Sequence, residues 1–206
     1  MIYFDGQQDK YNMIFPMPME EEYEEKYYSL KNKYNTDNLV DFYNETKDGT
    51  DDITIEKNVM FAEDEYTIKV DDNGIKLCTS CAAGDFRALT SLRQLIRRGE
   101  GHQVQFSVVH DKPAFEKRSY MLDISRCKTL KPEQICDLID KLAALKYNEF
   151  QLYMEGDCFK YAAYPKETAD FDCLTPEDIE YLDRYCANRF INLVPNQNCL
   201  GHMGTW

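Results

Sequence analysis

Two stretches in the first half of the chain alternate between apolar and polar positions. Residues 66–70 alternate strictly, which is typical of a half-buried strand. Asn73 and Gly74 follow directly and predict a tight hairpin, whose return strand covers residues 75–78. The second alternating stretch, residues 103–109, predicts a further strand of the same sheet.

Between these strands, apolar positions recur with the spacing of a helix. The residues that share one helical face are Phe86, Leu89, Leu92 and Ile96. We expect Asp85 to cap the start of this helix, and Arg97 and Arg98 to lie in its last turn, where the helix dipole favours cations. A helix among antiparallel strands predicts a small α+β domain over residues 1–112.

The pattern changes after residue 112, where short apolar runs alternate with amphipathic helices. The runs cover residues 120–123, 150–153 and 191–194. Pro132 and Thr175 mark the helix starts, because proline suits a first turn and threonine suits an N-cap. This order predicts a parallel α/β sheet over residues 113–206. It fits about three strands of an incomplete TIM-type (β/α)8 barrel, which takes about 250 residues when complete, or a small open α/β domain.

Ionisable and amide residues follow each of the three predicted parallel strands. They are Asp123, Arg126, Glu155, Asp157, Asn196, Gln197, Asn198 and His202. Parallel sheets hold their ligands at the carboxyl ends of the strands, so these positions form the candidate site. We interpret Asp123 and Arg126 as a structural ion pair. The amides at 196–198 either hold a polar ligand or satisfy loop backbone groups.

Composition excludes several classes of function. The chain has 24 basic and 37 acidic residues and a net charge of −13, so we expect no nucleic-acid partner. No apolar run approaches the roughly 20 residues that span a bilayer, and the first ten residues lack a secretory pattern. We therefore expect a cytoplasmic protein without a membrane partner. Residues 20–25 hold five glutamates and predict a solvated face or loop, with Tyr23, Tyr27 and Tyr28 on a half-buried helix face.

The chain has eight cysteines, and in a cytoplasmic protein we expect them to be reduced. Cys78 and Cys81 have CxxC spacing, but no second pair follows at zinc-binding spacing. A redox pair would open a helix, whereas the predicted helix begins later, near Asp85. We interpret the pair as structural and expect neither a metal site nor a cofactor.

Residues 118–126 read Arg-Ser-Tyr-Met-Leu-Asp-Ile-Ser-Arg. They are similar to the R-G-x-x-L-D-x-x-R strand that opens the catalytic barrel of glycoside hydrolase family 20, the β-N-acetylhexosaminidases, with Ser119 replacing the usual glycine. Further segments resemble the same family, in the right order. The segments that resemble later parts of the barrel are 138–153 and 194–203. Those that resemble the α+β domain preceding it are 65–68, 73–75 and 84–95. The likeness extends over residues 50–206.

The resemblance implies a hydrolase that removes terminal β-linked N-acetylhexosamine by a retaining, substrate-assisted route. In this route the acetamido oxygen of the substrate attacks the anomeric carbon. The resemblance implies that Arg118 grips the sugar hydroxyls and that Glu155 and His202 support the general acid. Asp157, which competes with Glu155 for its role, and Asn196 are further candidates for substrate binding.

The family's central chemistry belongs to an adjacent Asp-Glu pair after a fourth strand, which we expect beyond Trp206. The 206 residues would then be the N-terminal portion of a glycosidase of carbohydrate metabolism, inactive by themselves. Alternatives are a non-catalytic, carbohydrate-binding or degenerate fragment, and an unrelated open α/β domain. Unpaired barrel edges would favour self-association.

Overall fold

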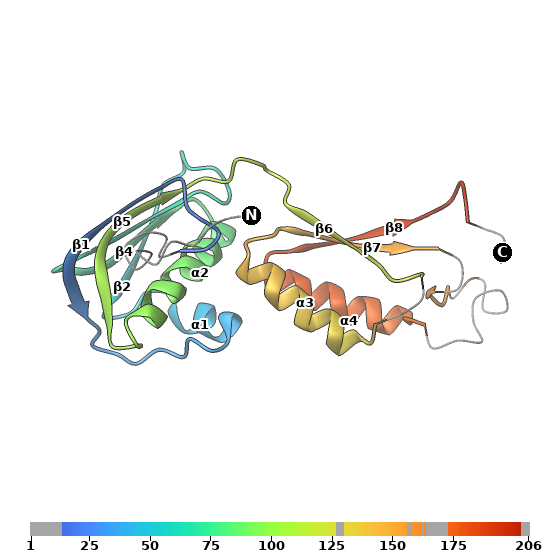
Figure 1. Cartoon of the computed structure of the whole chain (residues 1–206), viewed down its shortest axis with the longest axis horizontal. Helices are drawn as coiled ribbons and strands as arrows, with labels where there is room; N and C mark the ends of the chain where they lie inside the picture. The colour runs from blue at the N-terminus through green and yellow to red at the C-terminus, as the bar shows by residue number, and fades with distance from the viewer. Residues whose placement is uncertain (1–13, 127–129, 156–157, 162, 164–172, 203–206) are drawn as a thin grey trace, which may run out of the picture. The chain divides into compact units, whose positions relative to one another are not determined.

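The chain forms two compact units, Met1–Ala114 and Phe115–Trp206 (Figure 1). The structure is a computed structural model that describes residues 14–126, 130–155, 158–161, 163 and 173–202. The predicted domain boundary after residue 112 lies close to this division. None of the described helices is both long and apolar enough to cross a membrane.

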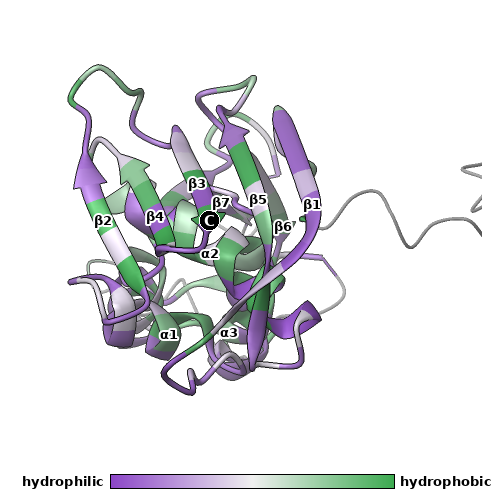
Figure 2. Cartoon of the chain, turned by 90° about the vertical axis from the view of Figure 1, so that its left-hand side faces the viewer, coloured by the Kyte–Doolittle hydropathy of each residue, from purple (hydrophilic) through white to green (hydrophobic). Residues whose placement is uncertain are grey.

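The first unit is a five-stranded sheet with two helices on one face (Figures 1 and 2). Its strands are β1 (Glu20–Ser29), β2 (Ile53–Lys57), β3 (Tyr66–Asp71), β4 (Gly74–Thr79) and β5 (Gln103–Asp111), and its helices are α1 (Leu39–Thr46) and α2 (Ala82–Arg98). The strand order is β1-β5-β3-β4-β2. The predicted hairpin, helix and following strand are confirmed. The sheet is mixed rather than antiparallel, because β2 pairs with β4 in parallel.

Alternation along the strands builds the core of this unit. Tyr66, Ile68 and Val70 of β3 are buried, whereas Thr67 and Lys69 between them are more exposed. The residues of α2 that form the predicted apolar face, Phe86, Leu89, Leu92 and Ile96, are all fully buried. Gly74 closes the hairpin with a φ of 119°, a backbone conformation that side chains other than hydrogen strongly disfavour.

The glutamate-rich segment 20–25 is a largely exposed strand, which agrees with the predicted solvated face and not with the alternative of a loop. It belongs to β1, which pairs with β5 in an antiparallel manner and lies at the edge of the sheet. Figure 2 shows that β1 is mostly hydrophilic. As an edge strand it makes backbone hydrogen bonds to one neighbour, and most of its side chains are exposed to water. The predicted helix face of Tyr23, Tyr27 and Tyr28 is wrong for the same reason: all three lie on this strand.

Helix α2 begins at Ala82, earlier than predicted, with Cys81 at its N-cap. Asp85 does not cap the helix, because it already lies within the first turn. Its carboxylate instead contacts Lys57 Nζ at 2.5 and 2.6 Å. The CxxC pair therefore does meet the start of a helix. Its cysteines differ in setting, since Cys78 lies within β4 between the buried residues Leu77 and Thr79, whose side chains point to the opposite face.

The second unit is a three-stranded parallel sheet whose helices lie on one face (Figure 1). Its elements are β6 (Ser119–Asp123), α3 (Pro132–Ala144), β7 (Glu149–Met154), α4 (Pro176–Ala187) and β8 (Asn192–Gln197). These elements confirm the predicted order. Thr175 caps α4 by accepting a hydrogen bond from the backbone of Asp178, and Pro176 is the first helical residue. Ile135, Ile139, Phe150 and Leu182 form the fully buried core between the layers.

The register of the parallel strands assigns side chains to two different faces. Asp123, Tyr153 and Asn196 are paired positions in one row across the sheet. Phe150, Leu152 and Met154 of β7 are buried on the face covered by the helices, so Gln151 and Tyr153 point to the opposite face. The carboxyl ends of all three strands meet at one edge.

Candidate functional site

The shared edge where β6, β7 and β8 end carries a cluster of polar side chains, which we call the edge cluster. Its members are Asp123, Ser125, Arg126, Tyr153, Glu155, Asn198 and His202. Each lies at the end of a strand or in the loop that follows it. The parallel sheet therefore brings together residues that are up to 79 positions apart in the chain, from Asp123 to His202.

Arg126 is the centre of the edge cluster. Its two terminal nitrogens contact two carboxylates, at 2.9 Å from Asp123 Oδ2 and 2.6 Å from Glu155 Oε1. The guanidinium also lies 5.7 Å from the centre of the Tyr153 ring. The side chain is 54% exposed, and a guanidinium has five N–H donors, so this arginine is held in place with donors left for a ligand.

Glu155 is fixed by the residues around it and is largely shielded from solvent. The Tyr153 hydroxyl donates to Glu155 Oε1 at 2.5 Å, and the backbone N–H of Glu155 donates to Ser125 Oγ at 2.7 Å. Asn198 Nδ2 in turn donates to the Tyr153 hydroxyl at 3.0 Å. The carboxylate is thus oriented through contacts to all three strand ends.

The charges of the edge cluster stabilise one another. Burial raises the pKa of Asp123, but the backbone N–H groups of Ser125 and Arg126 and the Arg126 guanidinium outweigh it and lower this pKa overall. The Glu155 carboxylate raises the pKa of Arg126. Hydrogen bonding to the same carboxylate raises the pKa of Tyr153, which keeps its hydroxyl protonated as a donor. The contacts of the cluster therefore favour the charged forms of Asp123 and Arg126 and the neutral form of Tyr153.

His202 lies in the loop after β8, with Nδ1 at 3.9 Å from Glu155 Oε2. Its side chain is well exposed, and its φ of 55° lies in the left-handed region that residues other than glycine seldom adopt. Asn198 Oδ1 accepts a hydrogen bond from the backbone of Gly201 and so ties this loop together. The structure brings together the two residues predicted to be catalytic, and their catalytic role stays a prediction.

Arg118 does not join them, contrary to its predicted grouping. It directly precedes β6, at the amino end of the strand, so about 17 Å of extended backbone separates it from the carboxyl end. Its Nε donates to the backbone oxygen of Lys146 at 2.8 Å, and NH1 donates to that of Phe115 at 2.9 Å. The first arginine of the 118–126 motif stabilises local backbone, whereas the second, Arg126, reaches the edge where strands end.

The other two predicted substrate-binding residues have different outcomes. Asn196 points to the face opposite the helices, where Nδ2 donates to Gln151 Oε1 at 3.1 Å. It belongs to the row of Asp123 and Tyr153, next to the edge cluster. Asp157 lies outside the described residues.

Sequence reasoning missed Tyr153 and Ser125 as parts of the site, whereas Asn198 was among the predicted strand-end residues. The signal for Tyr153 is its position two residues before Glu155, since strand periodicity points both side chains to the same face. Asp123 and Arg126 do form the predicted ion pair, and the contact of Arg126 with Glu155 adds a second carboxylate to it. Among the described residues, no group of three or more His, Cys, Asp or Glu is placed to hold a metal ion.

The second unit as a whole matches a known family. The model of the glycosyl hydrolase family 20 catalytic domain matches residues 115–206. Residues 115–206 are therefore similar to the catalytic domain of glycosyl hydrolase family 20. Its similarity to a beta-hexosaminidase subunit beta of Entamoeba histolytica is 25% identity over 155 residues, which cover 70% of this chain and 27% of that protein. A beta-hexosaminidase of Porphyromonas gingivalis is 25% identical over 173 residues, covering 73% and 22% of the two chains.

Solved family 20 structures share the fold of this chain. The β-N-acetylhexosaminidase of Streptomyces coelicolor A3(2) superposes with a TM-score of 0.77 at 20% identity, covering 94% of this chain and 47% of that one. The enzyme of Bacteroides fragilis gives a TM-score of 0.73 at 22% identity, covering 89% and 44%. The chain thus spans about a quarter of the curated relatives and less than half of these solved chains.

Proposed function

We propose that this chain supplies part of the sugar-binding site of a family 20 glycosidase that acts on terminal β-linked N-acetylhexosamine. The observation that carries the proposal is the position of Arg126, held between Asp123 and Glu155 at the carboxyl ends of parallel strands and half exposed to solvent. Support for the substrate comes from a relative of known structure, an exo β-N-acetylglucosaminidase of Vibrio harveyi in complex with N-acetylglucosamine.

A fixed guanidinium suits the recognition of a sugar. Adjacent hydroxyls of a pyranose present pairs of acceptors, and the planar fork of an arginine offers donors in a fixed geometry. Asp123 and Glu155 hold the fork before the ligand arrives, so little side-chain entropy is lost on binding. We therefore assign the hydroxyl-binding role to Arg126 in place of Arg118.

Glu155 and His202 then form the supporting part of the acid machinery. Their contact distance of 3.9 Å allows the carboxylate to orient a protonated or neutral imidazole towards a third group. In the proposed reaction the acetamido oxygen of the substrate is the nucleophile, and an Asp-Glu pair outside the 206 residues orients it and protonates the leaving group. The three parallel strands would be the first three of a (β/α)8 barrel.

Sugar binding by the chain tests the proposal directly. We expect N-acetylglucosamine to shift the NMR signals of residues in the edge cluster during a titration, with weak, saturable binding. Arg126→Gln should abolish these shifts because it removes the charged fork. Arg118→Gln is the matched control, since it removes an arginine at the other end of the same strand. Equal binding by the two variants would overturn the assignment.

Hydrolysis is tested separately. We expect the 206-residue chain to release no detectable 4-nitrophenol from 4-nitrophenyl N-acetyl-β-glucosaminide, because the proposed Asp-Glu pair lies outside it. Turnover that is lost in a Glu155→Gln variant would show that the chain holds a complete active site and would contradict this part of the proposal. Absence of both binding and turnover would favour a degenerate domain without a sugar site.

A further inference from the structure

A short parallel bridge joins two segments of the second unit that lie outside its main sheet. Phe159 pairs with Leu174, and the backbone N–H of Leu174 donates to the oxygen of Cys158 at 3.2 Å. On the other side of the bridge, the N–H of Lys160 donates to the oxygen of Leu174 at 3.0 Å. In a parallel ladder this pattern places Cys158 opposite Cys173, the residue before Leu174, with the two backbones about 4.8 Å apart.

The spacing of these two cysteines suits a disulfide. Residues joined by a disulfide usually have Cα atoms between about 4.4 and 6.8 Å apart, and opposite positions of paired segments fall within this range. Both side chains are thiols in the structure. Burial is the largest cause of a raised pKa of the Cys158 thiol, and the charge of Cys173 raises this pKa further. The Cys173 side chain therefore lies near enough to act on that of Cys158.

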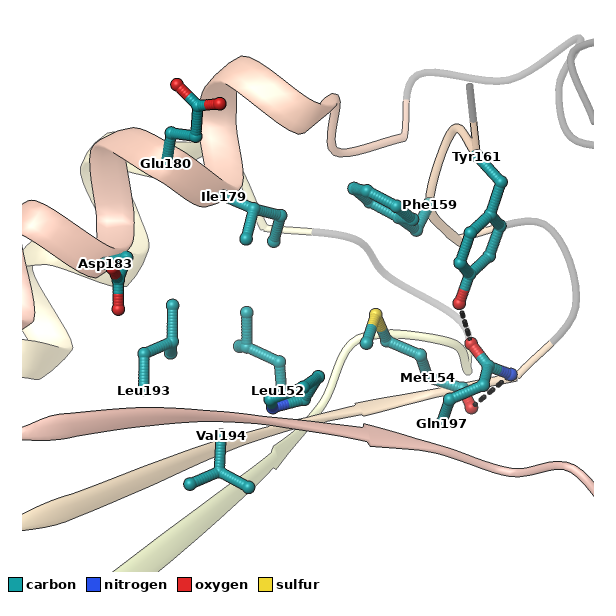
Figure 3. Close-up of a pocket in the computed structure, with 11 residues that line it drawn as sticks. Leu152, Met154, Phe159, Tyr161, Ile179, Glu180, Asp183, Leu193, Val194 and Gln197 are labelled. Carbon is teal, nitrogen blue, oxygen red and sulfur yellow. Dashed lines mark hydrogen bonds between the residues drawn. The ribbon is translucent and has the colours of Figure 1, made fainter. Parts of the chain in front are cut away.

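Contacts to the main sheet and to α4 hold one side of the bridge in place. Phe159 and Tyr161 line a groove between α4 and the strands β7 and β8, and Figure 3 shows Phe159 beside Ile179 of α4. The rings of Phe159 and Tyr161 meet edge to face, with their centres 4.7 Å apart. The Tyr161 hydroxyl also donates to Gln197 Oε1 of β8. The segment that carries Cys158 is thus fixed against the sheet, so little backbone movement is needed for a bond to form.

The bridge connects the end of β7 to the start of α4. Cys158 is three residues after Glu155 of the edge cluster. Cys173 is two residues before Thr175, the N-cap of α4. Cys158 Sγ lies 3.8 Å from Ser125 Oγ, the atom that accepts the backbone N–H of Glu155. A bond between the two cysteines would therefore join the end of a strand to the start of the next helix, beside the edge cluster.

We propose that Cys158 and Cys173 are a disulfide-forming pair, oxidised by a dissolved disulfide such as oxidised glutathione. Cys173 is half-buried, whereas Cys158 is only 6% exposed, so the exchange begins at Cys173. Its thiolate attacks one sulfur of the glutathione disulfide and displaces one glutathione thiolate. The Cys158 thiolate then attacks the mixed disulfide and displaces the second. In all, the two cysteines lose two protons and two electrons, and one glutathione disulfide becomes two molecules of glutathione.

Other cysteines of the second unit are less suited to this exchange. Cys136 and Cys186 lie on the packed helices α3 and α4 and are 6% and 0% exposed, so a dissolved disulfide reaches neither. Cys173 is 13 residues from Cys186 and 15 from Cys158, so chain length alone does not favour the proposed pair. The expectation that all cysteines are reduced depends on the compartment, whereas the position of this pair depends on the fold.

Peptide mapping of the 206-residue chain tests the proposal. The chain is kept in a mixture of reduced and oxidised glutathione, its remaining thiols are blocked, and it is digested with trypsin without reduction. Trypsin cleaves after basic residues, so the two cysteines fall in separate peptides, 147–160 and 167–184. We expect mass spectrometry to find these peptides joined and dithiothreitol to separate them. Oxidation should also raise the melting temperature of the second unit by about 5 °C or more, because the bond restricts the unfolded chain.

Single replacements separate the pair from its competitors. Cys158→Ser and Cys173→Ser should each abolish the joined peptides and the gain in melting temperature. Cys199→Ser, which removes an exposed thiol of the same unit, should leave both unchanged. In concentrated urea, where chain length alone decides, Cys173 should link to Cys186 as often as to Cys158.

Three results would overturn the proposal. The first is a folded chain that shows no joined peptides, or one in which Cys173 links to another cysteine as often as to Cys158. The second is the same preference for Cys158 in urea as in the folded chain, because the fold would then play no part. The third is a bond that lowers the melting temperature, since the fold would then not present the pair at the spacing of a disulfide.

Discussion

The two units use buried carboxylates in different ways, and Asp52 and Glu155 make the contrast plain. Asp52 of the first unit is 3% exposed and accepts hydrogen bonds from the Tyr28 and Tyr34 hydroxyls at 2.9 and 2.8 Å. It also accepts from the backbone N–H groups of Lys31 and Asn32. All these donors are neutral. Glu155 of the second unit instead pairs with Arg126, which is open to solvent.

The difference separates a structural carboxylate from one that is ready for a ligand. The donors around Asp52 join the chain after β1 to the start of β2, and they surround the carboxylate from within the unit. Burial raises the pKa of Asp52, but the combined hydrogen bonds lower it overall, so the charge is stabilised without a cation. The cation that pairs with Glu155 is Arg126, which also pairs with Asp123 and has further N–H groups on its exposed guanidinium. Arg126 is thus open to solvent, whereas the described donors around Asp52 are taken up within the first unit.

The largest expected effect comes from the core that supports the edge cluster. Phe150 is fully buried beneath the helices, and Phe150→Ala should lower the free energy of unfolding of the second unit by about 4 kcal/mol. Urea denaturation measures the change. Phe115→Ala, at a position that is 74% exposed, is the control and should have little effect. A loss below about 1 kcal/mol for Phe150→Ala would mean that the sheet is not held by this core.

Removing the charge of Asp52 should cause the next largest loss of stability. Asp52→Asn leaves hydroxyl and N–H donors facing an amide nitrogen, so we expect the first unit to lose about 3 kcal/mol of stability. Asp51→Asn, at the exposed neighbouring position, should leave the urea midpoint almost unchanged. If both variants behave alike, Asp52 is not the structural centre that distinguishes the first unit.

Acid should weaken the first unit through the same residue. The pKa of Asp52 is lowered in the folded state, so the unfolded chain binds a proton more readily. Stability from this group is present above the unfolded pKa of about 3.9 and is lost as the pH falls through the lower folded pKa. Unfolding free energies measured from pH 6 downwards should drop less steeply in Asp52→Asn. Parallel curves for the two proteins would contradict the linkage.

The smallest expected effect concerns ligand binding by the second unit. Tyr153→Phe removes the donor to Glu155 without emptying space, and should weaken binding of N-acetylglucosamine about fivefold. Tyr161→Phe removes a hydroxyl at the groove and should leave sugar binding unchanged. An NMR titration of both variants tests whether orientation of Glu155 matters. If the two variants bind N-acetylglucosamine with equal affinity, Tyr153 has a structural role only.

Much of the architecture follows from local patterns in the sequence. The parallel strands, the hairpin at Gly74 and the start of α4 at Pro176 depend on periodicity and on residues with strong backbone preferences, and the structure agrees. β1 could not be recognised in this way. Its glutamates are as compatible with a solvated edge strand as with a loop. The segment is a strand because it pairs with β5, which local sequence does not show.

The sequence predicted where the candidate site lies, but not which arginine belongs to it. Glu155 and His202 follow strands whose carboxyl ends must meet, so their proximity follows from the parallel order. The choice between Arg118 and Arg126 depends on which end of β6 each residue occupies, and the motif contains both. Spacing alone does not reveal that Arg118 is held by the backbone oxygens of Phe115 and Lys146.

The alternation of side chains along β7 also limits which insertions and deletions the strand tolerates. Successive side chains from Phe150 to Glu155 point alternately to the side of α4 and to the side of the edge cluster. Insertion or deletion of one codon would exchange the two sets, placing Leu152 and Met154 where Tyr153 and Glu155 now lie. We expect this strand to tolerate replacements of matching polarity at either set, and to tolerate changes of length only in steps of two residues.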